Sequence, residues 1–230
     1  MPSLPFYLQS ETITLSFYLN YFMPLFFYAL WDILYGFAAV KDNLQDPPTP
    51  RPSTVEAYRP LLRFSGFPEP FVKGKAGFWS RWSANYLKQV VMEDIRDLAD
   101  LKKTDTVELL FSLLPSRVAS PVSVNNLAAD LRSNFDSVAR WLSLFDSFFL
   151  TFRISPWSAK ISRSILKEKK TYLYDYPEIP DPAARLENLI AVELKRAVTT
   201  WTELGYGRFS LHYLRNKEKE EVDFLVADCN

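Results

Sequence analysis

The sequence predicts an α+β protein, in which a helical and winged helix-turn-helix domain is followed by an α/β layer. Apolar residues recur at helical spacing in residues 86–101 and 135–149. Two β-prone runs, 150–154 and 172–174, flank a Ser- and Lys-rich connection of the kind that forms a wing. Beyond that point strand and helix patterns alternate, which favours an α/β layer.

Composition sets limits on the function. The chain has 230 residues, 48% of them hydrophobic, which is enough for one large domain or two small ones. The 27 Lys and Arg residues cancel the 27 Asp and Glu residues, which excludes a globally basic binder but not a local basic face. One Cys (Cys229) and one His (His212) exclude most zinc sites, disulfide frameworks and Ser–His catalysis. No G-x-x-x-x-G-K-[S/T] run occurs, so the chain is not itself a P-loop NTPase.

The first 45 residues form an apolar segment unlike the rest. Thr12 to Trp31 is 20 residues without a charge, long enough to span a bilayer. The segment is either a membrane anchor, a buried amphipathic element or a wrongly assigned start. Because the first cation is Lys41, the positive-inside rule places the bulk of the chain in the cytoplasm. We expect a cytoplasmic protein, or alternatively a membrane-anchored one with its C-terminal bulk in the cytoplasm.

A Pro-rich linker at 46–59 leads into the first domain, residues 60–170. Two helices are expected at 86–101 and 106–114, the second ended by Pro115. A short helix at 124–131 and a longer helix at 135–149 then form the helix-turn-helix. The expected inner face of the longer helix is Val138, Trp141, Leu142, Phe145 and Phe149.

The turn and the outer face of this longer helix supply candidate nucleic-acid contacts. They are Asn134, Ser137 and Arg140. A DNA-reading helix usually offers more Arg, Lys, Asn or Gln than this one. The alternative is a winged helix used for packing or for contact with a protein partner.

The second domain, residues 171–230, carries the candidate catalytic carboxylates. A helix is expected at 184–198, with Leu186, Leu189, Ile190, Leu194 and Ala197 as its apolar face, and strands at 209–214 and 222–226. Glu187 and Glu193 lie on that helix about 120° apart, so only one of them would face inward.

Asp223 alternates with apolar neighbours on a strand, where a carboxylate needs a partner or a metal. A Mg²⁺-dependent nuclease requires two or three carboxylates and a Lys around the scissile phosphate. Glu187 or Glu193, together with Asp223 as metal ligand, supplies part of that set. The alternative is that Asp223 caps its strand or pairs with Arg215 or Lys217.

Several motifs, in this order, resemble a known family. They are Phe64-Ser65-Gly66-Phe67-Pro68-Glu69-Pro70-Phe71, Trp79, the run 86–98, Leu127-Ala128-Ala129-Asp130-Leu131, the run 170–175, the run 186–194 and Glu221-Val222-Asp223-Phe224. The set resembles the C-terminal part of prokaryotic predicted ATPases of the AAA superfamily, called domain of unknown function 4143. The resemblance covers about residues 60–228.

The resemblance implies a P-loop ATPase module, a winged helix-turn-helix and a restriction-endonuclease-like region. In that comparison Glu187 or Glu193 matches the helix carboxylate and Asp223 matches the strand carboxylate. The chain departs from the family in having no P-loop, so ATP enters only through a missing or separate ATPase module. A Glu-x-Lys strand expected after Asp223 is also absent, so we expect residues 171–230 to be a truncated endonuclease-like domain.

The expected function is therefore that of an accessory or remnant module of an AAA-type ATPase. It would bind nucleic acid, with DNA the first candidate, or a protein partner, and would not itself hydrolyse ATP. Two alternatives stay open. One is a metal-dependent nuclease-like domain using Mg²⁺, and the other is a binding protein tethered to a membrane through residues 12–31.

Overall fold

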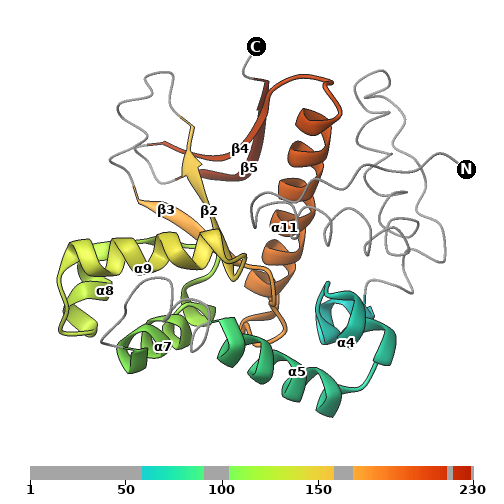
Figure 1. Cartoon of the computed structure of the whole chain (residues 1–230). Coiled ribbons are helices and arrows are strands. Elements are labelled where there is room, and N and C mark those ends of the chain that lie inside the picture. Colours follow the sequence, from blue (N-terminus) through green and yellow to red (C-terminus); the bar gives the residue numbers. More distant parts are fainter. Residues whose placement is uncertain (1–58, 91–103, 158–167, 217–219, 229–230) are drawn as a thin grey trace, which may run out of the picture. The chain divides into compact units, whose positions relative to one another are not determined.

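Helices and strands alternate along the chain in a mixed α+β fold, which confirms the predicted class (Figure 1). The computed structural model describes residues 59–90, 104–157, 168–216 and 220–228. The helices are α4 (Pro68–Lys73), α5 (Ala76–Lys88), α7 (Thr104–Leu113), the 3-10 helix η2 (Pro115–Arg117), α8 (Val124–Asp130), α9 (Phe135–Ser147) and α11 (Pro182–Glu203). The strands are β1 (Pro121–Val122), β2 (Thr151–Pro156), β3 (Lys169–Leu173), β4 (Phe209–Arg215) and β5 (Glu221–Asp228).

Side-chain caps fix where three of these helices begin. Ser123 accepts a hydrogen bond from the Asn126 backbone N–H at the start of α8 (3.4 Å). Asn134 does the same for Ser137 at the start of α9 (2.7 Å). Asp181 caps α11, where Pro182 occupies the first turn and has no N–H to leave unpaired. These caps explain why α8 and α9 begin at the residues the sequence predicts.

The predicted inner face of α9 is buried, with one exception. Val138, Trp141, Leu142 and Phe145 are at most 4% exposed. Phe149 lies beyond the end of α9 with a positive φ of 56°, and its ring packs 5.8 Å from that of Tyr174.

The helix expected at 86–101 is described only at its start: residues 86–88 are the last of α5, which begins at Ala76, and residues 91–101 lie outside the described residues. One prediction about a helix needs correction. On α11 the buried stripe is rotated from the expected face. Leu186 and Ile190 are 36% and 42% exposed, whereas Asn188 and Ala191 are fully buried. The rotation occurs because Asn188 turns inward to hydrogen bond the Leu173 backbone of β3.

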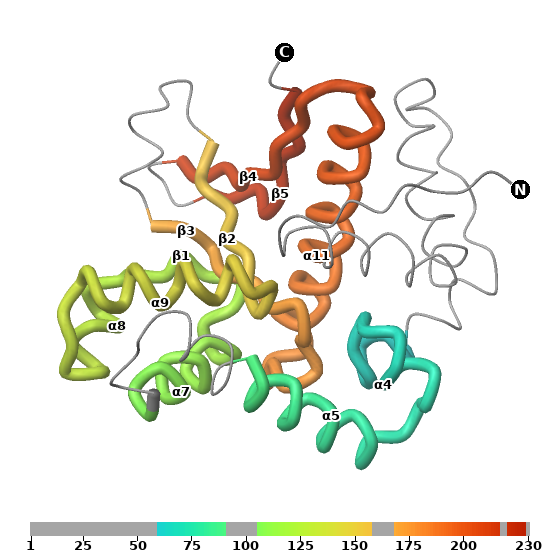
Figure 2. Tube along the Cα trace, in the orientation of Figure 1, coloured from blue at the N-terminus to red at the C-terminus, as the bar shows by residue number. Residues whose placement is uncertain are grey.

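The five strands form one sheet in the order β1-β3-β2-β4-β5. β3 pairs antiparallel with both β1 and β2, and β4 pairs antiparallel with β5. β2 joins the two halves because it changes partner: Ile154 pairs with Lys170 of β3, and Ser155 pairs with His212 of β4 in parallel. Figure 2 shows β2 leaving β3 and running beside β4. We call this change of partner the fork.

The fork brings the two expected domains into one sheet. The boundary expected between residues 170 and 171 falls inside β3, and residues 61–230 belong to one compact unit. Helix α11 packs against β3 and β4 and covers both sides of the fork (Figure 1).

The segment expected as a membrane anchor, residues 12–31, lies outside the described residues. Within the described ranges, no helix combines the length and the apolar character that crossing a membrane requires.

Candidate functional site

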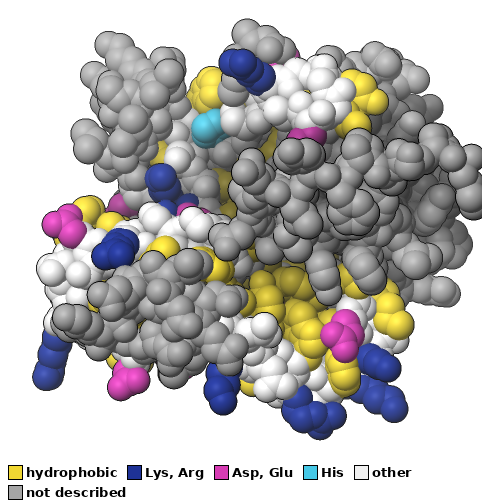
Figure 3. Space-filling model, viewed as in Figure 1, with side chains coloured by type: hydrophobic (Ala, Val, Ile, Leu, Met, Phe, Trp, Pro, Cys, Tyr) yellow, Lys and Arg dark blue, Asp and Glu magenta, His cyan; other side chains and the backbone are white. Residues whose placement is uncertain are grey.

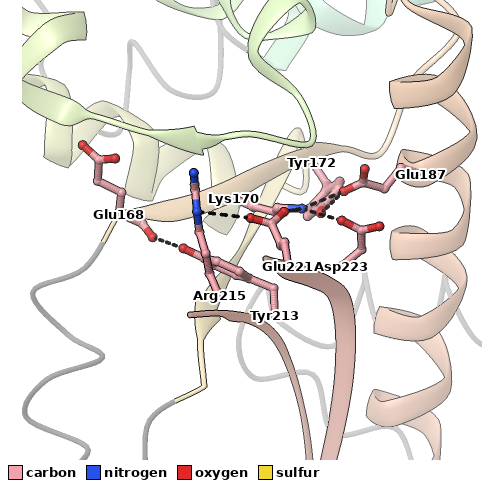
Figure 4. A network of polar contacts seen from close by, with 8 residues as sticks. All are labelled: Glu168, Lys170, Tyr172, Glu187, Tyr213, Arg215, Glu221 and Asp223. Carbon is pink, nitrogen blue, oxygen red and sulfur yellow. Dashed lines mark hydrogen bonds and ion pairs between the residues drawn. The ribbon is translucent and has the colours of Figure 1, made fainter. Parts of the chain in front are cut away.

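A fully buried lysine holds three carboxylates together at the fork. The Nζ atom of Lys170 lies 3.1 Å from Glu187 Oε1, 2.5 Å from Glu221 Oε1 and 3.0 Å from Asp223 Oδ1 (Figure 4). The Lys170 side chain is 0% exposed, while those of Glu187, Glu221 and Asp223 are 20%, 23% and 53% exposed. We call these four residues and Tyr172 the Lys170 cluster.

Three elements position this cluster. Lys170 on β3 pairs with the last β2 residue before the fork, so its side chain reaches into the opening of the sheet. Glu221 and Asp223 are two residues apart on β5 and therefore share a face. Glu187 lies in the second turn of α11, and the Tyr172 hydroxyl donates a hydrogen bond to its Oε1 (2.8 Å).

Two residues of β4, Tyr213 and Arg215, also contact the cluster. The ring of Tyr213 lies 5.6 Å from Lys170 Nζ, and its hydroxyl donates to the backbone carbonyl of Glu168 (2.8 Å). Arg215 Nε lies 3.7 Å from Glu221 Oε2. A shallow hollow of about 350 Å³ opens next to it, lined by Leu214, Arg215, Asn216, Glu220, Glu221 and Val222.

The electrostatics of the cluster keep Lys170 charged. Burial lowers the pKa of Lys170, but the hydrogen bonds that its ammonium donates to Glu221, Asp223 and Glu187 together raise the pKa above its ordinary value. Burial and the neighbouring Glu187 raise the pKa of Tyr172, so its hydroxyl stays protonated and remains a donor. Three carboxylates against one buried ammonium leave an excess of negative charge at the site.

The structure brings together two of the three predicted catalytic residues. Glu187 and Asp223 meet on Lys170. Glu193 lies apart from them, 13% exposed and paired with Arg196, and burial raises its pKa. Their separation around α11 is what the six-residue spacing predicts. Asp223 contacts neither of its expected structural partners in the described residues: Arg215 pairs with Glu221, and Lys217 is not among them.

Sequence reasoning missed Lys170, Tyr172 and Glu221. It expected a lysine only on a strand after Asp223, whereas the lysine comes from β3, more than fifty residues earlier. All three missed residues lie in the motifs that carry the family resemblance. Only the fork, which a linear pattern cannot show, places them side by side.

The oxygen atoms of the cluster are of the type that binds metal ions, but they are not arranged to hold one. Carboxylate oxygens suit Mg²⁺. However, the Lys170 ammonium lies within hydrogen-bond distance of all three carboxylates, in the space a shared ion would need. Among the residues the structure describes, no three His, Cys, Asp or Glu side chains are placed to hold a metal.

The predicted nucleic-acid residues lie at the start of α9. The side-chain oxygen of Asn134 caps α9 by accepting a hydrogen bond from the Ser137 backbone N–H. Ser137 is half-buried and Arg140 is exposed. Nearby, Arg117 pairs with Asp130 (2.6 Å) and Arg153 pairs with Asp146 (2.7 Å). The helix-turn-helix segment therefore presents a mixed surface rather than a strongly basic one.

The comparisons with known proteins give one match. The family model described as "Domain of unknown function (DUF8612)" matches residues 55–176, more than half of the chain. The chain belongs to this family. The DUF8612 match includes Lys170 and Tyr172, whereas Glu187, Glu221 and Asp223 lie beyond it. Neither a curated protein nor a solved structure matches the chain.

Proposed function

We propose that this chain is an accessory module of an AAA-type ATPase, equivalent to the C-terminal region of those proteins, and that it works by docking on a protein partner. The P-loop is supplied by a separate ATPase module. The observation that carries the proposal is the convergence at the Lys170 cluster. Three motifs separated in the sequence, 170–175, 186–194 and 221–224, contribute Lys170, Glu187, Glu221 and Asp223 to one point. Convergence of this kind supports a shared ancestral site, because short motifs that match by chance have no reason to meet in space.

The order of elements supports the winged-helix part of the proposal. Helices α7, α8 and α9 are followed by the β2–β3 hairpin, and the short β1 pairs with β3 to give the order β1-β3-β2. The endonuclease-like part is supported by α11, which carries Glu187 and packs on the sheet that carries Asp223. Both assignments belong to this proposal.

A protein partner fits the α9 surface better than duplex DNA does. Two arginines around the helix-turn-helix are bound to carboxylates, and Asn134 is engaged as a cap. Phe135, the first residue of α9, is 50% exposed. An exposed aromatic ring is typical of a protein contact, and a surface whose charges are already paired is less suited to phosphate groups.

The test measures docking of the full chain on an isolated P-loop module from an ATPase with the same C-terminal motifs. We expect a complex in size-exclusion chromatography, weakened about tenfold or more by Phe135→Ser. Tyr206→Ser is the matched control, because Tyr206 is an exposed aromatic residue (70%) that lies three residues past the end of α11. A chain that forms no complex, or equal losses in both variants, would overturn the docking proposal.

A second candidate is a metal-dependent nuclease-like activity, which the residue types of the Lys170 cluster support although the Lys170 ammonium lies where a shared ion would bind. The cluster supplies two candidate carboxylates and the lysine that such chemistry requires at a scissile phosphate. The measurement is cleavage of supercoiled plasmid with Mg²⁺. We expect Asp223→Ala to abolish cleavage without loss of DNA binding, and Glu193→Ala to leave it unchanged. Absence of cleavage by the native chain would remove this candidate.

A further inference from the structure

The N-terminal part of the described fold carries an unpaired cationic surface. Residues 61–90 contain five Lys and Arg but a single acid, Glu69. All five cations are exposed: Arg63, Lys73, Lys75, Arg81 and Lys88. Figure 3 shows Lys and Arg side chains gathered along the edge formed by α4 and α5. We call these five residues the α4–α5 basic surface.

Several cations elsewhere in the fold, unlike those of this surface, are held by acids. Lys170, Arg117, Arg153 and Arg196 are all bound to carboxylates. Within the described ranges, no ion pair joins any cation of the α4–α5 basic surface to an acid. The chain as a whole has no net charge, so this excess is a local feature. Unneutralised like charges repel each other, and an anionic partner relieves that repulsion.

Helix α5 carries two of these cations, Arg81 and Lys88, on its outer side. Its inner side is fixed by Trp79 and Ser83, which both donate hydrogen bonds to Asp175 (3.1 and 2.5 Å). Its outer side is the exposed stripe Arg81, Ala84, Asn85 and Lys88. Arg81 and Lys88 are two turns apart on nearly the same face and about 10 Å apart along the axis. That distance matches the rise of about three nucleotides of one strand.

We propose that the α4–α5 basic surface binds the phosphate backbone of nucleic acid, without reading its sequence. Small side chains between the cations allow a strand to approach the helix closely, and Asn85 adds an amide donor. The surface is separate from the α9 surface that the docking proposal uses, so either proposal can fail alone.

A lipid surface fits these residues less well. A helix that lies on a bilayer needs an exposed apolar face. Here Trp82 stacks on Tyr86 (5.1 Å between centroids) and packs against Phe67 (4.8 Å), so the three aromatic residues contact one another and are only partly exposed. Of the large hydrophobic residues on α4 and α5, only Val72 is strongly exposed (76%).

The test is fluorescence anisotropy of labelled DNA, single-stranded and duplex, of about 20 nucleotides per strand. With the full chain, we expect binding that weakens steeply with salt. Arg81→Glu with Lys88→Glu should raise the Kd about tenfold or more and reduce the slope of log K against log salt by about two. Arg132→Glu with Arg208→Glu, two exposed cations elsewhere, is the matched control and should keep both values near those of the native chain.

Three outcomes would overturn the proposal. The first is that the native chain does not bind DNA, and the second is that both double variants lose equal affinity. The third is that the native chain binds anionic vesicles instead of DNA, and that the α5 double variant no longer binds those vesicles. If circular dichroism shows that the charge reversal disturbs folding, Arg81→Gln with Lys88→Gln replaces it. Both glutamines favour a helix, and unchanged DNA binding in that variant would equally reject the proposal.

Discussion

Lys170 is the residue on which the candidate site depends for its stability. Replacement by Met removes the shared cation from Glu187, Glu221 and Asp223 and leaves like charges side by side. Removing one partner of an ion pair costs about 3–5 kcal/mol when the charge left behind is fully buried. Here the carboxylates left behind are partly exposed, so we expect Lys170→Met to lower the free energy of unfolding by about 1–3 kcal/mol in urea titrations near neutral pH. Lys169→Met, on the neighbouring half-buried lysine, should change it by about 1 kcal/mol or less. Equal losses would mean that the network does not hold the fork.

Glu193 should make stability depend on pH in the opposite sense to an ion-paired acid. Burial raises its pKa in the folded state, in spite of the nearby Arg196. A raised pKa means that the folded protein binds the proton more tightly than the unfolded chain does. The associated stability is therefore present at low pH and is lost as the pH rises through the folded-state pKa. Glu193→Gln should gain stability relative to the native chain as the pH rises from about 4 to 7, measured by urea unfolding. Exposed Glu203→Gln is the control, and a parallel change in both variants would contradict the prediction.

At this scale the sequence predicts two of the acids that meet at Lys170, but not the lysine. Asp223 stands out because an acid among apolar neighbours needs an explanation. Glu187 and Glu193 are equal candidates in the sequence, although their spacing indicates that only one of them faces inward. Lys170 gives no such signal, since a lysine in a strand is usually solvated. Its burial follows from long-range pairing alone.

Among the elements, α5 depends on one acid outside itself. It has no fully buried residue, so its own packing contributes little to holding it in place. Asp175, just after β3, accepts hydrogen bonds from Trp79 and Ser83. Asp175→Ala should increase hydrogen exchange of the α5 amides and cost about 1–3 kcal/mol, because both donors lose a charged acceptor. Asp175→Asn should restore part of the protection.

Glu69 provides the control for this prediction. Glu69 lies on α4 and accepts a hydrogen bond from Trp82 of α5 (3.1 Å), but this hydrogen bond is exposed. Glu69→Gln should leave the exchange of α5 close to that of the native chain. If it loosens α5 as much as Asp175→Ala does, the anchor at the end of β3 is not what holds the helix.

The sequence predicts well the elements whose caps and spacing of apolar residues agree. Helices α8 and α9 and the strands β4 and β5 lie within a few residues of their expected bounds because caps, turns and apolar spacing agree. The missed elements have little pattern to offer. Helix α4 is six residues long, from Pro68 to Lys73, and is capped by Gly74 with a positive φ of 57°, and β1 has two residues. Such short elements depend on their neighbours for stability.

For the whole molecule, the fork is what turns two expected domains into one sheet. Only Ser155 and Pro156 of β2 pair with β4, so the backbone link between the two halves is short. The Lys170 cluster and the Tyr213 contact to Glu168 add side-chain links across the same opening. A single folding unit therefore depends on groups that a division at residue 171 would separate.

This dependence can be measured by native-state hydrogen exchange in the full chain. If the fork couples the halves, the slowest amides of β3 and β4 should report the same free energy of opening, within about 1 kcal/mol. Two separately folding domains would instead give each strand its own value. In Lys170→Met the backbone link remains but the side-chain links are lost, so the values for β3 and β4 should diverge. Equal free energies of opening for β3 and β4 in the variant would show that the two residue pairs between β2 and β4 are enough to couple the halves of the sheet. The Lys170 cluster would then not be needed for this coupling.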